Sequence, residues 1–309
     1  MILSVSRRTD IPNYYSDWFF NRIREGYLYV RNPMNFHQVS KISLSPELVD
    51  CIVFWTKNPA PMLDRLGELE KYHYYFQFTL TGYGKDLEPN VPHKKKEMIP
   101  IFQELSRRIG RERVIWRYDP ILLTERYTVE YHVKAFAEIA RELEGYTGKV
   151  VISFVDFYAK MNQKGVYFTE MKEADCRFLA EKLAEIAKQY HMQIGSCAEN
   201  MDLSAYGIAH NSCIDKAVIE TIIGCPIKAG KDKNQREACG CVESIEVGTY
   251  DTCLNGCKYC YANNSDGRIK SKVSRYHPLS PLLCGEITAE DNITERKVKS
   301  LREEQIRLF

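Results

Sequence analysis

Seven short apolar runs alternate along this chain with amphipathic stretches of helical pattern. Runs that are hydrophobic on both faces are typical of buried parallel strands, because helices cover both sides of such a sheet. The runs occupy residues 2–7, 51–57, 74–81, 113–120, 149–158, 192–197 and 243–250. Strands that alternate with helices in this way predict an α/β fold with a parallel sheet, closed wholly or partly into a TIM-type barrel. An open doubly wound sheet is the alternative, but the sequence has neither G-x-G-x-x-G nor G-x-x-x-x-G-K-[ST].

The helical stretches between the runs cover residues 15–28, 96–110, 128–146 and 173–191. No linker rich in Pro, Ser and Gly divides the chain. We therefore expect one domain over residues 1–262, with an irregular cysteine-rich insert at 198–242. Residues 263–309 are expected to form an extension packed on the barrel. Its last part, 295–309, predicts a final helix anchored by apolar side chains, namely Ile306, Leu308 and Phe309.

Charge and hydropathy limit the kinds of partner that this protein is expected to bind. Lys and Arg number 43 against 41 Asp and Glu, so no broad basic field indicates binding to duplex DNA or to an anionic membrane. No apolar run approaches the roughly 20 residues of a membrane span, and two early arginines interrupt any secretory signal. These features predict a cytoplasmic protein without a membrane partner. Reducing conditions there disfavour disulfides, so its 11 cysteines favour metal binding or thiol chemistry.

Eight of the cysteines fall within residues 197–260, and three of them form the strongest local motif. Cys253, Cys257 and Cys260 have the spacing C-x3-C-x2-C, with the aromatic Tyr259 just before the third cysteine. Three thiolates on a short loop can hold three irons of a [4Fe–4S] cube and leave the fourth iron open to another ligand. Zinc bound by the three thiolates and one further ligand is the alternative.

This loop, TCLNGCKYCYAN, resembles the cluster loop of the radical S-adenosylmethionine (SAM) superfamily, and CKYCYAN is close to the form in its spore photoproduct lyase-like branch. In that superfamily the loop follows the first barrel strand, whereas here it follows the run at 243–250. Strand order in a closed barrel is cyclic, so a circularly permuted chain can assemble the same site with its last strand beside its first. The resemblance therefore predicts a permuted barrel with a C-terminal cluster-bearing strand.

Other segments share the resemblance. IVFWTKNPAPMLDRL is similar to the T-K-N-P segment of the lyase-like branch, and FQFTLTGYGKDLEPNVP is similar to its S-I-T segment followed by E-P. Together with SRRTDIP at the start, the chain resembles the domain-of-unknown-function family number 1848, whose C-terminal cysteines have been likened to a radical SAM cluster. That family indicates no substrate.

The resemblance implies an iron-sulfur enzyme that reductively cleaves SAM to a 5'-deoxyadenosyl radical, which abstracts hydrogen from an unidentified substrate. An electron donor such as flavodoxin or ferredoxin is then a partner. The expected catalytic residues follow strand ends and are Arg7, Arg8, Asp10, Lys57, Arg117 and Asp119. The expected cofactor-binding residues are Ser6, Thr79, Thr81 and Tyr259.

Some of these residues have specific expected contacts. Arg7 or Arg8 and Lys57 would pair with the SAM carboxylate. Thr79 or Thr81, in the apolar run 74–81, would contact its ribose, and Tyr259 would lie against its adenine. The alternatives without a role in catalysis are that the two threonines are ordinary strand residues and that Arg117 and Asp119 form a structural ion pair.

A second metal site is indicated by four further cysteines. Cys197, Cys213, Cys239 and Cys241 could bind an auxiliary [4Fe–4S] cluster or a zinc ion. Cys225 could replace one of them, and the alternative is that all are buried or free thiols.

Two other classes of function stay open at this point. A metal-stabilised nucleic-acid-binding protein would use a local lysine patch, although the near-neutral charge argues against it. An iron-sulfur redox protein without SAM chemistry would need a fourth protein ligand on its cluster. A cluster motif specifies how a radical is made and leaves the substrate undetermined.

Overall fold

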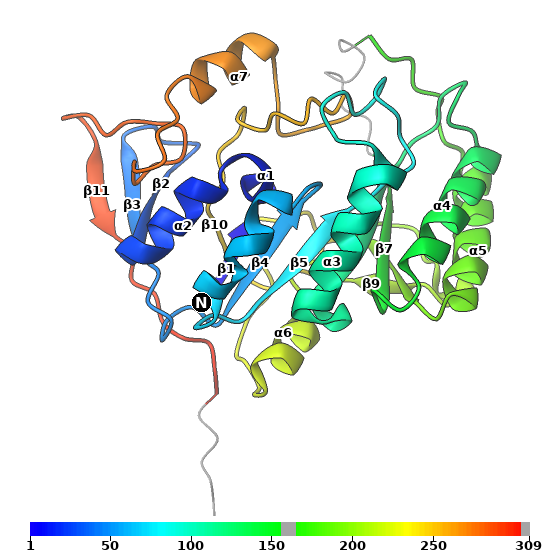
Figure 1. Cartoon of the computed structure of the whole chain (residues 1–309), viewed down its shortest axis with the longest axis horizontal. Coiled ribbons are helices and arrows are strands. Elements are labelled where there is room, and N and C mark those ends of the chain that lie inside the picture. The colour runs from blue at the N-terminus through cyan, green and yellow to red at the C-terminus, as the bar shows by residue number, and fades with distance from the viewer. Residues whose placement is uncertain (156–164, 304–309) are drawn as a thin grey trace, which may run out of the picture.

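A computed structural model describes residues 1–155 and 165–303 of the chain. Its central element is an eight-stranded sheet in which every paired neighbour is parallel (Figure 1). The strands, in spatial order, are β10 (Ile245–Glu246), β1 (Ile2–Val5), β4 (Cys51–Thr56), β5 (Tyr74–Thr79), β6 (Val114–Ile121), β7 (Lys149–Phe154), β8 (Gln193–Cys197) and β9 (Ala209–Asn211). The predicted α/β fold with a parallel sheet is confirmed. Among the described residues, strands β10 and β9 form the two edges of the sheet.

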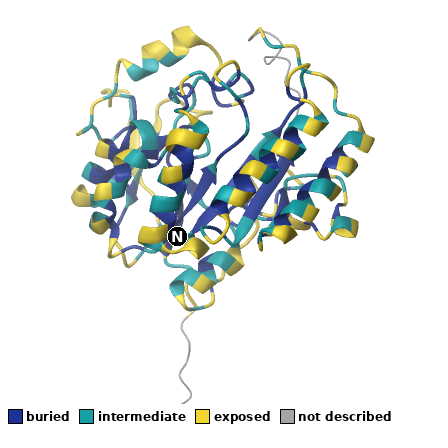
Figure 2. Cartoon of the chain, turned by 45° about the vertical axis from the view of Figure 1, so that its right-hand side comes forward, coloured by how far each residue is buried: buried dark blue, intermediate teal, exposed yellow. Residues whose placement is uncertain are grey.

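Both faces of this sheet are buried, which explains why its strands read as continuous apolar runs. On β6, Trp116 points toward the helices and stacks on Phe136 of helix α4 (Val129–Leu143) with ring centroids 4.6 Å apart. Its neighbour Ile115 points to the opposite face, where it packs with Tyr75 and Val151. We call that opposite face, which Tyr75, Ile115 and Val151 line, the inner face. Figure 2 shows the strands as the most buried part of the molecule.

Helices form in all four stretches where the amphipathic pattern predicts them, and shorter helices that were not predicted form elsewhere. The α-helices are α1 (Ile11–Tyr14), α2 (Ser16–Glu25), α3 (Ile99–Ile109), α4 (Val129–Leu143), α5 (Glu173–Gln189), α6 (Lys216–Ile223) and α7 (Asp266–Val273). A 3-10 helix, η1, spans Ala60–Leu69, and a short π-helix, η2, spans Lys94–Met98. Thr128 caps α4, since its hydroxyl accepts a hydrogen bond from the Tyr131 amide at 3.2 Å. Gly26, at φ 75°, ends α2 in the left-handed conformation that glycine tolerates best.

A second, three-stranded sheet was not predicted. Strand β2 (Tyr27–Arg31) pairs antiparallel with β3 (Gln38–Ser43), and β11 (Asn292–Glu295) pairs parallel with β3. The extension thus returns to the N-terminal part of the chain. The predicted helix over 295–309 is wrong over its described part, because Glu295 is in β11 and residues 296–303 are not helical. The proposed anchors Ile306, Leu308 and Phe309, like Asp156 at the end of the run 149–158, lie outside the described residues.

Strand β10 lies beside β1, as the sequence analysis expects for the run that precedes the three-cysteine motif. Leu3 pairs with Ile245 and Ser4 with Glu246. The two strands approach closely just beyond this pairing, where Gly248 faces Ser6. A Cβ on Gly248 would lie 1.8 Å from the Ser6 Oγ, so only glycine fits there. This pairing places the cysteine motif next to the segment that follows β1.

Candidate functional site

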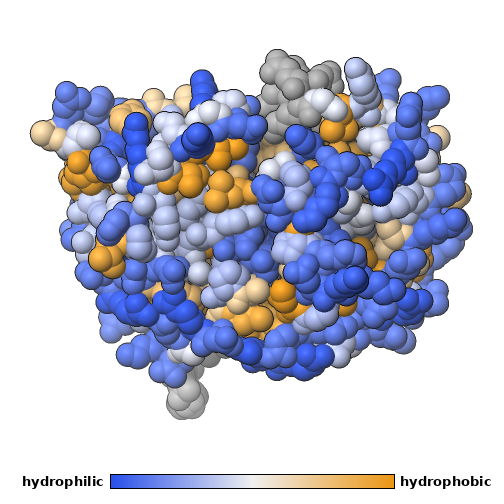
Figure 3. All heavy atoms as spheres, turned by 45° about the horizontal axis from the view of Figure 1, so that its top comes forward, coloured by the Kyte–Doolittle hydropathy of each residue, from blue (hydrophilic) through white to orange (hydrophobic). Residues whose placement is uncertain are grey.

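The loops that follow the carboxyl ends of the parallel strands gather at one end of the molecule, beneath α7 (Figure 1). They include residues 6–10 after β1, residues 80–93 after β5 and the three-cysteine loop, which we define as residues 251–264, after β10. Ligands of parallel α/β sheets commonly bind at this end. Figure 3 turns this end of the molecule toward the viewer. The surface seen there is mostly hydrophilic, with separate hydrophobic spots.

The three-cysteine loop is closed at its base by hydrogen bonds. The Asp251 amide donates to the Ala262 carbonyl at 3.0 Å, and the Asn263 side chain donates to the Cys253 carbonyl at 2.7 Å. Within the loop, the Cys260 amide donates to the Cys257 carbonyl at 3.2 Å. The structure therefore holds Cys253, Cys257 and Cys260 on one tightly turned segment.

Burial shapes the chemistry of these thiols. It raises the pKa of the Cys257 thiol to about 12, although the ammonium of Lys57 opposes the rise. Burial also raises the pKa of Cys253, and the Asp10 carboxylate adds to this effect. Such thiols keep their protons near neutral pH unless a metal ion replaces them, since thiolates are the metal-binding form.

Asp10 joins the segment after β1 to this loop. Its carboxylate accepts hydrogen bonds from the Asn255 amide at 2.9 Å, the Thr56 hydroxyl at 2.6 Å, and the backbone amides of Lys57 and Asn13 at 2.8 and 3.2 Å. Burial nevertheless raises the pKa of this carboxyl group. Both carboxylate oxygens are engaged, so Asp10 positions its neighbours in this structure, and the catalytic role expected from the sequence stays a prediction.

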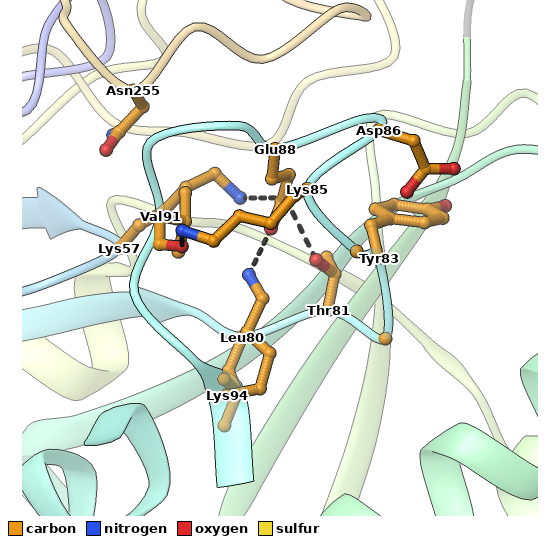
Figure 4. A network of polar contacts seen from close by, with 12 residues as sticks. Lys57, Leu80, Thr81, Tyr83, Lys85, Asp86, Glu88, Val91, Lys94 and Asn255 are labelled. Carbon is orange, nitrogen blue, oxygen red and sulfur yellow. Dashed lines mark hydrogen bonds and ion pairs between the residues drawn. The ribbon is translucent and has the colours of Figure 1, made fainter. Parts of the chain in front are cut away.

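Lys57 belongs to a buried polar network beside the loop (Figure 4). Its ammonium donates to Glu88 at 2.7 Å and to the Tyr259 hydroxyl at 3.0 Å. Lys94 and Tyr259 also donate to Glu88, as does the Thr81 hydroxyl at 3.0 Å. Burial alone would raise the pKa of Glu88, but the charges of Lys57 and Lys94 outweigh it and lower that pKa to about 2. Glu88 is thus a charged anchor for two cations.

Glu88 and Lys94 were not singled out as site residues from the sequence. A lone glutamate in an irregular loop carries no motif of its own, and only the E-P resemblance pointed to this position. The network also occupies the hydroxyls of Thr81 and Tyr259, which the sequence assigned to the cofactor. Thr79 lies half-buried in β5.

The side chains that follow β1 point in different directions. Ser6 accepts a hydrogen bond from the Arg8 amide at 2.9 Å, and the Arg8 guanidinium lies 4.6 Å from the ring centroid of Tyr250. Arg7 points elsewhere, donating to the Ser244 hydroxyl at 3.0 Å and pairing with Asp232 at 3.6 Å. The two adjacent arginines therefore serve different parts of the site.

Arg117 and Asp119 form the ion pair that the sequence analysis named as the alternative to a catalytic role. The buried Arg117 guanidinium also donates to the Cys213 sulfur at 2.7 Å, and Ser153 donates to Asp119. The pair is therefore structural in its contacts and reaches a second group of cysteines.

That second group is brought together by the fold. The sulfur atoms of Cys197 and Cys213 are 3.0 Å apart, and Cys241 lies within hydrogen-bonding reach of both Cys213 and Cys239. The contact with Cys241 lowers the pKa of Cys239 to about 7. Among the described residues, no thiol contact joins Cys225 to these four.

Neither group of thiols stands as a ready-made metal site. Within residues 1–155 and 165–303, no three or more Cys, His, Asp or Glu side chains are already arranged to hold a metal ion. A surface cleft of about 580 Å³ borders Cys253, between the three-cysteine loop and α7. No described helix is both long and apolar enough to cross a membrane.

Comparisons with known proteins give a family and no activity. No curated protein matches the chain. One similar solved structure is described as "putative alpha-L-fucosidase from Bacteroides thetaiotaomicron"; it shares 14% identity over 52% of this chain and 68% of that chain, with a TM-score of 0.24, too low to support an argument. The family model described as "Domain of unknown function (DUF1848)" matches residues 2–262, and the chain belongs to this family.

Proposed function

We propose that this protein is a radical SAM enzyme whose [4Fe–4S] cluster is held by Cys253, Cys257 and Cys260. The supporting observation is the parallel pairing of β10 with β1, which sets the three-cysteine loop at the carboxyl end of a sheet strand. On this proposal the sheet is a partial TIM-type barrel, circularly permuted relative to the superfamily, so that the cluster-bearing strand comes last.

The donor set fits this group. Three thiols on one closed loop match the three protein ligands of a cube with one open iron, and Cys257 is buried while Cys253 borders the surface cleft. A cluster held by these three cysteines would supply one electron to bound SAM, which would split into methionine and a 5'-deoxyadenosyl radical able to abstract hydrogen from substrate. The substrate is unidentified.

The surrounding residues orient and insulate this site. Asp10 holds Asn255, which lies between Cys253 and Cys257, and so fixes the shape of the loop. Lys57 and Lys94 place two ammonium groups against one carboxylate, Glu88, so the network offers positive charge to a carboxylate ligand such as that of SAM. The cleft beside Cys253 has the volume of a small-molecule site.

Anaerobic reconstitution with iron and sulfide tests the proposal. The expected product is a brown protein that, with SAM and dithionite, forms 5'-deoxyadenosine measurable by chromatography. Cys257→Ala should lose both the colour and the product, whereas Cys176→Ala, on helix α5, should keep both. A colourless protein with zinc on the loop would contradict the proposal. A brown protein that binds no SAM would indicate a redox protein instead.

A further inference from the structure

Four cysteines from three separate segments meet on the inner face of the sheet. Cys197 ends β8, Cys213 comes two residues after β9, and Cys239 and Cys241 precede β10. Cys213, Cys239 and Cys241 lie in one buried cluster against which Cys197 packs, and the sulfur atoms of Cys197 and Cys213 are 3.0 Å apart. Cysteines this far apart in sequence converge only because the insert packs against the sheet.

The insert is fixed at this place by hydrogen bonds from the sheet. The side chains of Tyr75 and Gln77, both on β5, donate to the Cys213 carbonyl at 2.7 and 2.8 Å. Gly240 allows the Cys239–Cys241 segment to approach, because a Cβ there would lie 2.6 Å from the Ser212 hydroxyl. The thiols are therefore held in a defined position.

Hydrogen-bond donors face two of these sulfur atoms. The Arg117 guanidinium donates to the Cys213 sulfur at 2.7 Å, and the Ile214 amide donates to the Cys241 sulfur at 3.3 Å. Arg7 is a second, half-buried guanidinium whose charge acts on Cys241. Each of these cations also has a carboxylate partner, Asp119 for Arg117 and Asp232 for Arg7. Hydrogen bonds to ligand atoms of this kind are typical of the outer shell of metal sites.

The spacing of the sulfur atoms discriminates between the metals that thiolates bind. Zinc with Zn–S bonds of about 2.3 Å in a tetrahedron puts sulfur atoms roughly 3.8 Å apart. A [4Fe–4S] cube requires wider separations, because the iron-sulfide core lies between its thiolates. Cys197 and Cys213, at 3.0 Å, lie nearer to the zinc spacing than to the wider spacing of a cube.

We propose that Cys197, Cys213, Cys239 and Cys241 bind one zinc ion in a closed tetrathiolate site, separate from the three-cysteine loop. The ion joins β8 and β9, at one edge of the sheet, to the segment that leads into β10 at the other edge. Its role is structural, since four protein thiolates leave no open position for a reactant.

Metal analysis of the full-length protein tests this proposal. Protein produced with zinc should contain one zinc ion per chain by mass spectrometry. Cys213→Ser and Cys241→Ser should lose that zinc, whereas Cys225→Ser, in the same insert, should retain it. A triple Cys253→Ala, Cys257→Ala, Cys260→Ala variant should also retain the zinc, so failure of the radical SAM proposal would leave this result unchanged.

The wild-type protein supplies a second measurement that does not depend on the folding of variants. Replacement of zinc by Co²⁺ should give the absorption of a tetrahedral thiolate complex, and a mercurial reagent should release the metal as it titrates the thiols. A metal-free protein with a Cys197–Cys213 disulfide, or iron on these four thiols, would overturn the proposal.

Discussion

The side-chain amide of Asn255 donates a hydrogen bond to the Asp10 carboxylate at 2.9 Å, across 245 positions of the sequence. One partner lies just after the first strand and the other lies within the three-cysteine loop. The contact is buried, so water cannot replace it easily. It makes the shape of the loop depend on residues near the opposite end of the chain.

Replacing Asp10 should therefore destabilise the protein. In Asp10→Asn an NH2 group faces at least one of the donors that now reach the carboxylate, leaving buried groups without partners. We expect a loss of about 1–3 kcal/mol in the free energy of unfolding, measured by urea titration. Asp17→Asn is the control, since the Asp17 carboxylate is 74% exposed and pairs only on the surface. An equal effect in both variants would contradict the role given to Asp10.

Gly248 should be intolerant of any side chain. An added Cβ would lie 1.8 Å from the Ser6 Oγ and 2.5 Å from the Ser6 Cβ, so Gly248→Ala should separate β10 from β1. We expect a loss of about 1–3 kcal/mol or more in unfolding free energy. Gly67→Ala in η1 meets no atom within 4 Å and should be neutral or stabilising by about 0.4–1 kcal/mol. Thermal unfolding of the two variants compares them directly.

Glu88 should make stability depend on pH in the acidic range. Its pKa is about 2 in the folded protein against 4.5 for an ordinary glutamate, so the folded state favours the charged form. The resulting stabilisation is fully present above pH 4.5 and is lost as pH falls toward 2, by about 3 kcal/mol in all. Glu88→Gln should be less stable at neutral pH and should show a flatter profile in this window. An unchanged profile would refute the assignment.

His132 should also make stability depend on pH, in a range above that of Glu88. Burial lowers its pKa from 6.5 to about 4, although a hydrogen bond with the Leu122 carbonyl opposes this. Below pH 6.5 the unfolded chain takes up a proton that the folded protein refuses, so stability should fall between pH 6.5 and 4, by about 3 kcal/mol.

A neutral replacement isolates this contribution. His132→Gln should remove the loss of stability between pH 6.5 and 4 in urea titrations. His191→Gln is the matched control, because the His191 side chain is 81% exposed. If both variants keep the slope of the wild-type protein, His132 is not its source.

The sequence predicts the central sheet well because both faces of its strands are buried. Strands such as Cys51–Thr56 and Tyr74–Thr79 read as mostly apolar runs, and Gln77 is the one interior polar residue of the second. Strand β9 escaped prediction because Ala209 and His210 are exposed and carry no apolar signal. The small sheet escaped because pairing with β11 brings together segments that are distant in sequence.

The candidate site was predictable where spacing encodes chemistry. Three cysteines within eight residues predict a shared ligand whatever the fold around them, and this stays a prediction. Contacts that arise only when the chain packs leave no pattern in the sequence. Glu88 acquires its role only when Lys57 and Lys94 are folded against it, and Arg117 meets Cys213 only because the insert covers the inner face. Such contacts depend on tertiary structure alone.

Ser4 and Glu246 are joined by a hydrogen bond of 2.9 Å although 242 positions separate them. During translation the first strand leaves the ribosome long before the strand that covers its outer edge exists. The nascent chain must therefore keep an uncovered sheet edge from pairing with other molecules until residues 245–246 have been made. A metal that needs all three cysteines of the loop can likewise bind only after Cys260 has been made.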